Sequence, residues 1–172
     1  MSGRRHAFCH VNVTGCLILC LLFAGCATAN SDSTAAAQAR APQPLTFAAT
    51  GDGPRGKEDW TLLPEYFAAE KADGRARYLL HTGDLCKGSQ LFDDKYSTAV
   101  AALYRQSSMP VFFVVGDNEW NDQEDPEAAW TLWERDFMHF FEAYPEAPKV
   151  ARQTGQPDNI AWMDEGGLFM GI

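Results

Sequence analysis

The sequence predicts an α/β fold in which parallel strands alternate with helices in βαβαβ order. Three short apolar runs carry this prediction, because they end in Thr50-Gly51-Asp52, Thr82-Gly83-Asp84 and Val115-Gly116-Asp117. Amphipathic stretches separate the runs, so that a strand recurs roughly every 30 residues, the spacing of βαβ units. Right-handed crossovers of this kind give a mainly parallel sheet.

The expected elements follow one another along residues 45–172. Strands are expected at 45–50, 77–82 and 111–115, and the third is the clearest because it is apolar throughout and follows Pro110. Helices are expected at 58–72, 92–107 and 126–143, each with apolar residues at helical spacing. A loop rich in Pro, Gly and Gln is expected at 145–159, and a further strand at 167–172.

The third expected helix has a clear beginning and a strongly aromatic face. Asp125 is a suitable N-cap and Pro126 occupies the first helical position. Its aromatic residues are Trp130, Trp133, Phe137, Phe140, Phe141 and Tyr144. Such a stripe predicts packing against the sheet rather than stacking on a ligand.

Residues 1–25 have the composition of a lipoprotein-type signal peptide. Two arginines precede an apolar run that is too short to span a bilayer well. The segment Leu21-Leu22-Phe23-Ala24-Gly25-Cys26 resembles a bacterial lipobox, although Phe23 stands where Leu is usual, and it predicts lipid on Cys26. Cleavage after Ala27-Thr28-Ala29 is the alternative. Residues 26–44, rich in Ala, Ser, Thr, Gln and Pro, are expected to be a flexible tether.

These features predict an exported protein, periplasmic or anchored in the outer membrane. The hydrophobic content of 46% and the aromatic content of 12% argue against disorder. The formal charge of −9 disfavours nucleic acid and anionic membrane surfaces, so we expect membrane contact only through the lipid anchor. With Cys26 lipidated, Cys86 is the single thiol outside the leader and no disulfide framework is expected. No protein partner can be inferred from the sequence.

The three Gly-Asp pairs predict a metal site at one edge of the sheet. Parallel strands present their carboxyl ends at the same edge, so Asp52, Asp84 and Asp117 should converge. Neighbouring carboxylates repel one another, and a hard divalent cation among them would relieve the repulsion. Turns or helix caps are one alternative. A dinucleotide-binding loop is another, since residues 51–56 fit G-x-G-x-x-G, but Pro54 lacks the backbone donor that this motif uses.

Three blocks resemble the first signatures of the calcineurin-like metallophosphoesterases. They are Asp52, Gly83-Asp84-Leu85-Cys86-Lys87-Gly88 and Gly116-Asp117-Asn118-Glu119, in the family's order and spacing. The second block resembles G-D-x-x-x-x-G, with three residues rather than four between Asp84 and Gly88. The third resembles G-N-H-[DE], with Asp and Asn in place of Asn and His, and Pro54 replaces the histidine of the first block, D-x-H. The resemblance spans residues 45–172 and implies a fold of two sheets flanked by helices, of which this chain would hold the N-terminal half.

The resemblance implies a hydrolase of phosphate esters, with a small phosphate ester as substrate and two divalent metal ions (Mn, Fe, Zn or Mg) as cofactors. It assigns Asp52 to the first metal, Asp84 to both metals and Asp117 to the second. Asn118 would stand at the position of the catalytic histidine, but an amide cannot act as a general acid, so it would at most hydrogen-bond the substrate. Arg55 lies near the first block and could contact the substrate phosphate, but an ordinary surface arginine is the favoured interpretation.

The remaining polar residues of these blocks receive supporting roles. Glu119 would support the site from behind the ligands. Cys86 is expected to pack rather than to ligate, because two-metal chemistry of this kind favours oxygen and imidazole donors. His81 and His139 are expected to be structural.

The pattern stops before the histidine blocks that follow in the family. Three aspartates cannot complete two coordination spheres, so the second metal site is expected to be incomplete. We therefore expect a partial domain, the N-terminal half of a larger enzyme, which would be inactive alone. The alternative is a lipid-tethered, non-catalytic binding protein on a degenerate phosphoesterase fold.

Overall fold

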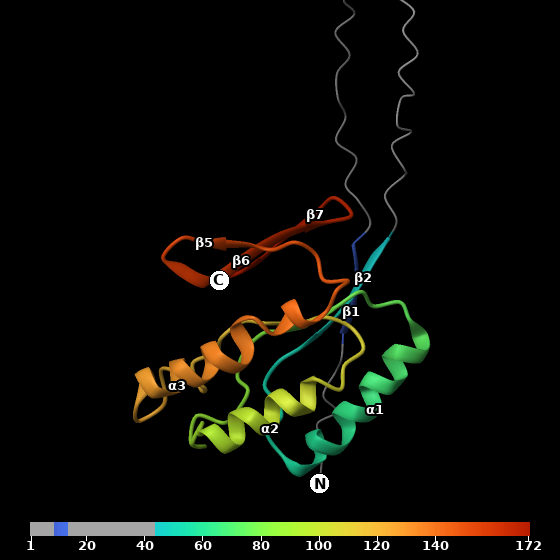
Figure 1. The fold of residues 1–172 in the computed structure, drawn as a ribbon. Coiled ribbons are helices and arrows are strands. Elements are labelled where there is room, and N and C mark those ends of the chain that lie inside the picture. The colour runs from blue at the N-terminus through green and yellow to red at the C-terminus, as the bar shows by residue number, and fades with distance from the viewer. Residues whose placement is uncertain (1–8, 14–43) are drawn as a thin grey trace, which may run out of the picture.

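The computed structural model describes residues 9–13 and 44–172, which form two sheets and a set of helices (Figure 1). The first sheet has the strand order β1-β2-β3-β4 and the second the order β5-β6-β7. The helices pack on one face of the first sheet and the second sheet packs on its other face, which gives three layers. Within the described residues, no helix is both long and apolar enough to cross a membrane.

The parallel part of the first sheet confirms the predicted βαβαβ order. Strands β2 (Leu45–Thr50), β3 (Leu79–His81) and β4 (Val111–Phe113) pair in parallel, with Ala49 opposite Leu80 and Leu80 opposite Phe112. The second and third strands are shorter than the apolar runs that predicted them. The chain leaves the sheet early there and enters the Gly-Asp turns.

The helices begin and end where local chemistry favours it. Helix α1 (Lys57–Asp73) ends at Gly74, which has φ 66° and donates its N–H to Glu70. Asp93 caps α2 (Asp94–Tyr104) by accepting from Tyr96 N at 2.8 Å. Asp125 caps α3 (Pro126–Trp133) in the same way, as predicted.

The helix expected at 126–143 forms, but it changes its winding along its length. After α3 it continues as the π-helix η1 (Glu134–Met138) and the 3₁₀ helix η2 (Phe140–Ala143). Trp133, Phe137 and Phe140 of the predicted aromatic stripe lie in the interior, each 1% exposed, whereas Trp130 and Tyr144 are half-buried. Most of the stripe therefore packs as core.

The second sheet corrects the prediction for residues 145–159. That segment contains β5 (Ala151–Gln153) and the start of β6 (Gln156–Asp164), not only a loop. The strand expected at 167–172 is confirmed as β7 (Gly167–Gly171), but it pairs antiparallel with β6 and does not extend the parallel sheet. The β6–β7 turn fits a tight hairpin, because both connecting residues, Glu165 and Gly166, have positive φ.

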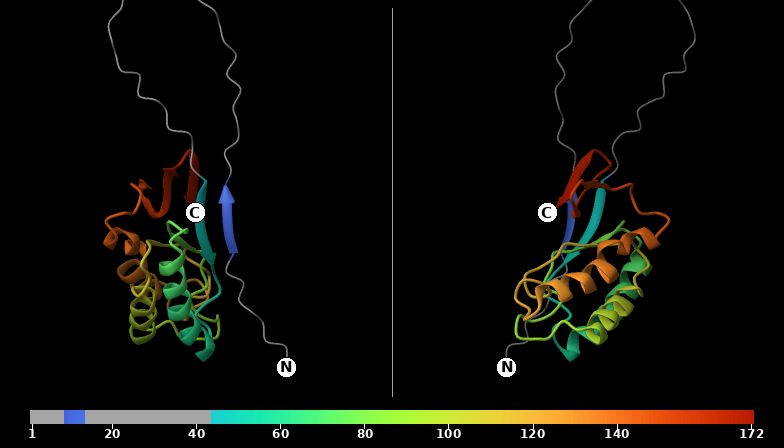
Figure 2. Two further views of the ribbon diagram at one scale, coloured as in Figure 1. Left: turned by 90° about the vertical axis from the view of Figure 1, so that its right-hand side faces the viewer. Right: turned by 60° about the vertical axis from the view of Figure 1, so that its left-hand side comes forward.

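Strand β1 (Cys9–Val13) lies in the segment that the sequence assigns to a signal peptide. It pairs antiparallel with β2 at the edge of the first sheet, with Cys9 opposite Ala49 and Val13 opposite Leu45 (Figure 2). This pairing was not predicted from the sequence. Cys26 and most of the predicted tether lie outside the described residues, so lipidation and cleavage stay predictions.

Candidate functional site

The turns that follow β2, β3 and β4 meet at the carboxyl edge of the parallel sheet. Asp52 N–H donates to Gly83 O at 3.1 Å, which ties the first turn to the second. A Cβ added to Gly116 would lie 2.3 Å from Asp84 N, so the third turn presses directly on the second. The sequence prediction that the three strand ends converge is therefore correct for the backbone.

Glycine is required where these turns touch. Gly83 has φ 93°, and a Cβ there would lie 2.8 Å from Gly116 Cα. A Cβ on Gly51 would lie 2.3 Å from Thr82 Oγ1. Each Gly of the Gly-Asp pairs thus allows the strand ends to approach more closely than a side chain would permit.

Two of the three aspartates adopt a backbone conformation that is rare for non-glycine residues. Asp52 has φ 59° and Asp84 has φ 63°. Left-handed backbone costs free energy outside glycine and concentrates at functional sites. In this conformation, both carboxylates lie at the sheet edge.

One arginine bridges the first two carboxylates. Arg55 Nη2 lies 2.5 Å from Asp52 Oδ1 and 2.7 Å from Asp84 Oδ2. The loop that carries Arg55 is anchored by Asp59 Oδ2, which accepts from the backbone N–H of Arg55 at 2.6 Å and of Gly56 at 3.1 Å. Arg55 therefore contacts two of the three predicted metal ligands, and its role toward a substrate stays a prediction.

Asp84 occupies the centre of the acidic group. Burial raises the pKa of its carboxyl above the usual range, and a side-chain hydrogen bond with Asp117 raises it further. The Arg55 guanidinium and a backbone N–H from Asn118 act in the opposite direction. Asp84 is thus linked to Asp52 through the Arg55 guanidinium and contacts Asp117 directly.

Asn118 and Glu119 hold the second and third turns together. Asn118 Nδ2 donates to Cys86 O at 3.0 Å. Glu119 is fully buried and accepts from Gly116 N at 2.7 Å and from Leu85 N at 3.0 Å. Burial raises the pKa of Glu119, while these backbone donors oppose the shift. Its contacts match the supporting role that the resemblance implied.

His81 is a structural residue of the first two turns. It is fully buried, its Nε2 lies 2.8 Å from Gly53 O, and its Nδ1 accepts from Gly83 N at 3.2 Å. This pattern fits a neutral ring with its proton on Nε2. Burial lowers the pKa of His81 from 6.5 to about 4, which keeps the ring neutral at physiological pH.

Cys86 and His139 also have structural contacts. The Cys86 thiol is buried and lies 3.4 Å from Asn118 O, and burial raises its pKa to about 12. His139 is exposed and its Nδ1 lies 2.8 Å from Glu142 Oε1 and 3.2 Å from Arg152 Nη2. Both rings are therefore engaged by other groups, His81 by the backbone of the first two turns and His139 by Glu142 and Arg152.

The oxygen donors of the site suit a divalent cation, but Arg55 lies between two of the carboxylates. Carboxylate oxygens are the ligands that hard divalent ions prefer, and the Arg55 guanidinium already stands as a positive group between two of them. However, no group of three or more His, Cys, Asp or Glu side chains in the described part of the chain is arranged to hold a metal ion. The aspartates form two pairs that share Asp84, rather than one cage.

Three supporting residues were not predicted from the sequence. Tyr96 Oη lies 2.6 Å from Pro54 O and 2.9 Å from Leu85 O, between the first two turns. Gln123 accepts from Phe92 N at 2.9 Å and donates to Asn118 O at 2.6 Å. Only Asp59 had a sequence signal, because an acidic residue three positions after an N-cap is typical of a capping box.

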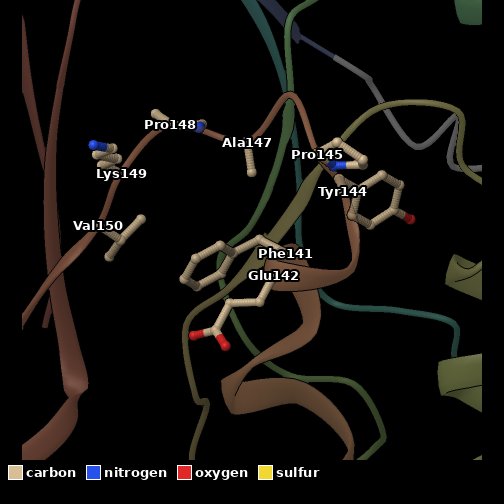
Figure 3. A pocket seen from close by; sticks show the side chains of 8 residues that line it. All are labelled: Phe141, Glu142, Tyr144, Pro145, Ala147, Pro148, Lys149 and Val150. Carbon is tan, nitrogen blue, oxygen red and sulfur yellow. The ribbon is translucent and has the colours of Figure 1, made fainter.

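Two surface cavities lie outside the acidic group. The cavity of about 550 Å³ in Figure 3 is lined by η2 and the segment that leads to β5, including Phe141, Tyr144 and Val150. It shares no residue with the strand-end turns. A second cavity, of about 710 Å³, reaches the third turn through Trp120 and is otherwise lined by α3, η1 and the start of β6.

The comparisons with known proteins agree with the geometry of the strand ends. The sequence profile of the calcineurin-like phosphoesterases matches residues 42–168, a range that contains all three Gly-Asp turns. No curated protein and no solved structure gives a significant match. The family characteristically uses divalent metals, which agrees with a site built from carboxylates. The chain belongs to the calcineurin-like phosphoesterase family.

Proposed function

We propose that the strand-end site takes part in metal-dependent hydrolysis of a phosphate ester, with Asp52, Asp84 and Asp117 as the metal ligands. The observation that carries the proposal is the close approach of the three Gly-Asp turns. Glycines and strained backbone hold carboxylates near one another, although such groups repel unless a cation lies among them. Family membership supports phosphoester hydrolysis in general.

The central position of Asp84 supports a bridging role between two divalent ions (Mn, Fe, Zn or Mg). Asp52 would complete the first site and Asp117 the second. Bound divalent ions would stabilise the negative charge of the reacting phosphoryl group. The second site is incomplete within residues 44–172, because no imidazole from this part of the chain is available to it.

Two further residues would act on the substrate. Arg55 can offer its planar guanidinium to phosphate oxygens once it is free of the aspartates. Asn118 can donate a hydrogen bond but cannot protonate a leaving group, so we assign it to orientation of the phosphate. Leaving-group protonation then has to come from water or from a residue outside these turns.

We further propose that the protein is exported and anchored through lipid on Cys26. The leader and lipobox of residues 1–26 support this location. The acidic composition supports a small phosphate ester as the substrate, rather than nucleic acid, and a membrane contact limited to the lipid.

A second candidate function is metal-dependent binding without catalysis. The observation that favours it is the side chain at the expected acid position, since Asn118 is an amide and donates its Nδ2–H to Cys86 O. A lipid-tethered binding protein could retain the carboxylates and lose turnover.

Hydrolysis of p-nitrophenyl phosphate and bis(p-nitrophenyl) phosphate by the full chain, over a range of Mn²⁺ concentrations, tests the proposal. Asp84→Asn should abolish both Mn²⁺ binding and any turnover, whereas Asp158→Asn, a control at the β5–β6 hairpin, should change neither. Binding of Mn²⁺ without turnover would favour the binding protein. Turnover at ordinary enzymatic rates would refute the prediction that the second metal site is incomplete. Turnover that depends on neither Mn²⁺ nor Asp84 would overturn the metal-dependent function.

A further inference from the structure

We propose that Arg55 is the counter-cation of Asp52 and Asp84, and that it must leave both carboxylates before a divalent ion binds between them. The inference rests on the proposed function, because it concerns the same carboxylates. It adds a residue that the family signatures do not assign: an internal competitor that sets the metal affinity of the site.

The contact geometry makes the two cations mutually exclusive. A single guanidinium nitrogen, Nη2, lies 2.5 Å from Asp52 Oδ1 and 2.7 Å from Asp84 Oδ2. A divalent ion bound by the same two oxygens would occupy the position of this nitrogen. The repulsion between a guanidinium and a dication at such a distance excludes joint occupancy.

The guanidinium is free to exchange partners. Among the described residues, it bonds to the carboxylates through Nη2 alone, and its Nε is buried without a hydrogen-bond partner. The loop below it is fixed independently, because Asp59 binds the backbone N–H groups of Arg55 and Gly56. Movement of the side chain therefore breaks its two carboxylate contacts and leaves the turn in place.

The electrostatic balance gives the direction of the effect. With Arg55 removed, Asp52 and Asp84 keep their strained backbone and lose the charge that offsets their repulsion. A metal ion would then relieve the repulsion without first displacing a competitor. If Arg55 instead served only to support the turn or to bind phosphate, its removal would leave metal affinity unchanged or weaken it.

The test is calorimetric titration of Mn²⁺ into the full chain and into Arg55→Met, a variant of similar length without the charge. We expect Arg55→Met to bind Mn²⁺ with a Kd lower by roughly tenfold or more. Arg55→Lys, which keeps the charge but not the planar fork, should lie between it and the parent chain. The matched control is Arg77→Met, because Arg77 also bridges two carboxylates, Asp164 and Glu165, and its loss changes the net charge equally.

Equal or weaker Mn²⁺ binding by Arg55→Met would overturn the inference and leave the proposed metal site intact. A similar gain in Arg77→Met would also overturn it, since the effect would then be one of net charge. Absence of Mn²⁺ binding in every chain would refute both this inference and the metal-dependent function. If Arg55→Met does not fold, the Arg55 Nε–H signal of the parent chain, followed by NMR during Mg²⁺ titration, supplies the answer: it must shift as the site fills, and a constant signal at saturation contradicts the displacement.

Discussion

Strand β4 borders two regions of opposite character, one on a face of the strand and one at its carboxyl end. On one side, the layer between the two sheets is apolar and aromatic: Phe112 stacks on Trp162 at 4.3 Å between ring centroids and on Phe141 at 4.7 Å. At the carboxyl edge, the same strand ends in a turn of glycine and charged residues that press against their neighbours. The aromatic layer is the smaller of two hydrophobic clusters of the fold, and burial in both offsets the strain and repulsion at the strand ends.

The comparison also separates two kinds of sequence constraint. In the aromatic layer, size and hydrophobicity decide, so another large apolar side chain can replace the native one at moderate cost. At the strand ends each residue has a separate structural role. Gly116 allows the third turn to contact the second, Glu119 accepts hydrogen bonds from two backbone N–H groups, and His81 links the first two turns. The following experiments test whether this division is real.

The largest effect is expected from Phe112→Ala in the aromatic layer. Removing a ring that is 2% exposed and stacked on both sides should lower the free energy of unfolding by about 3–5 kcal/mol. Phe112→Leu should cost only about 1–2 kcal/mol, because most of the volume remains. Urea denaturation measures both. Equal losses in the two variants would show that ring stacking, rather than volume, controls this layer.

At the strand ends, Gly116→Ala should cost about 3 kcal/mol, because its Cβ would lie 2.3 Å from Asp84 N and the backbone there cannot yield cheaply. Gly56→Ala is the control, since a Cβ there meets nothing within 4 Å, and it should cost no more than about 1 kcal/mol. The same denaturation series reports both values. A tolerated Gly116→Ala would mean that the turns are further apart than described.

Acidification should weaken the fold through His81. The unfolded histidine takes up a proton below pH 6.5, whereas the folded one resists until about pH 4. Stability is therefore complete above pH 6.5 and falls as the pH drops toward 4, by about 3 kcal/mol in full from this residue. Unfolding free energies of the parent chain and of His81→Gln, measured from pH 7 to 4.5, should show a shallower slope in the variant. Parallel slopes would contradict a buried neutral His81.

The smallest of these effects is expected from Glu119→Gln. The amide keeps one acceptor but turns an NH₂ group toward the other backbone N–H, which should cost about 2 kcal/mol. Glu65→Gln, on the exposed face of α1, should change stability by less than about 0.5 kcal/mol. Thermal unfolding monitored by circular dichroism is sufficient to compare them, and equal melting temperatures would remove Glu119 from the supporting network.

The sequence predicts the parallel half of the fold well because each signal there is local. An apolar run followed by Gly-Asp marks the end of a strand, and capping residues such as Asp125 mark the start of a helix. Strands β5 and β6 were not predicted because they contain polar or exposed residues such as Arg152, Gln153 and Gln156, and only antiparallel pairing makes them strand. The amino-acid composition of such exposed strands resembles that of a loop.

The site was predictable in its backbone and not in its side-chain contacts. The convergence of the Gly-Asp turns follows from parallel topology alone. The bridge from Arg55 to Asp52 and Asp84 depends on the direction of a long side chain, and the role of Gln123 depends on a contact across more than thirty residues, to Gln90 and Phe92. Neither leaves a pattern in the sequence.

The most direct test of the central claim is the anomalous scattering of manganese in crystals of the chain grown with saturating Mn²⁺. We expect a manganese peak bound by Asp84 and at least one of Asp52 and Asp117, with the Arg55 guanidinium withdrawn from Asp84. Manganese bound elsewhere, or Arg55 still between Asp52 and Asp84 with no peak beside them, would contradict the claim that these strand ends form a metal site.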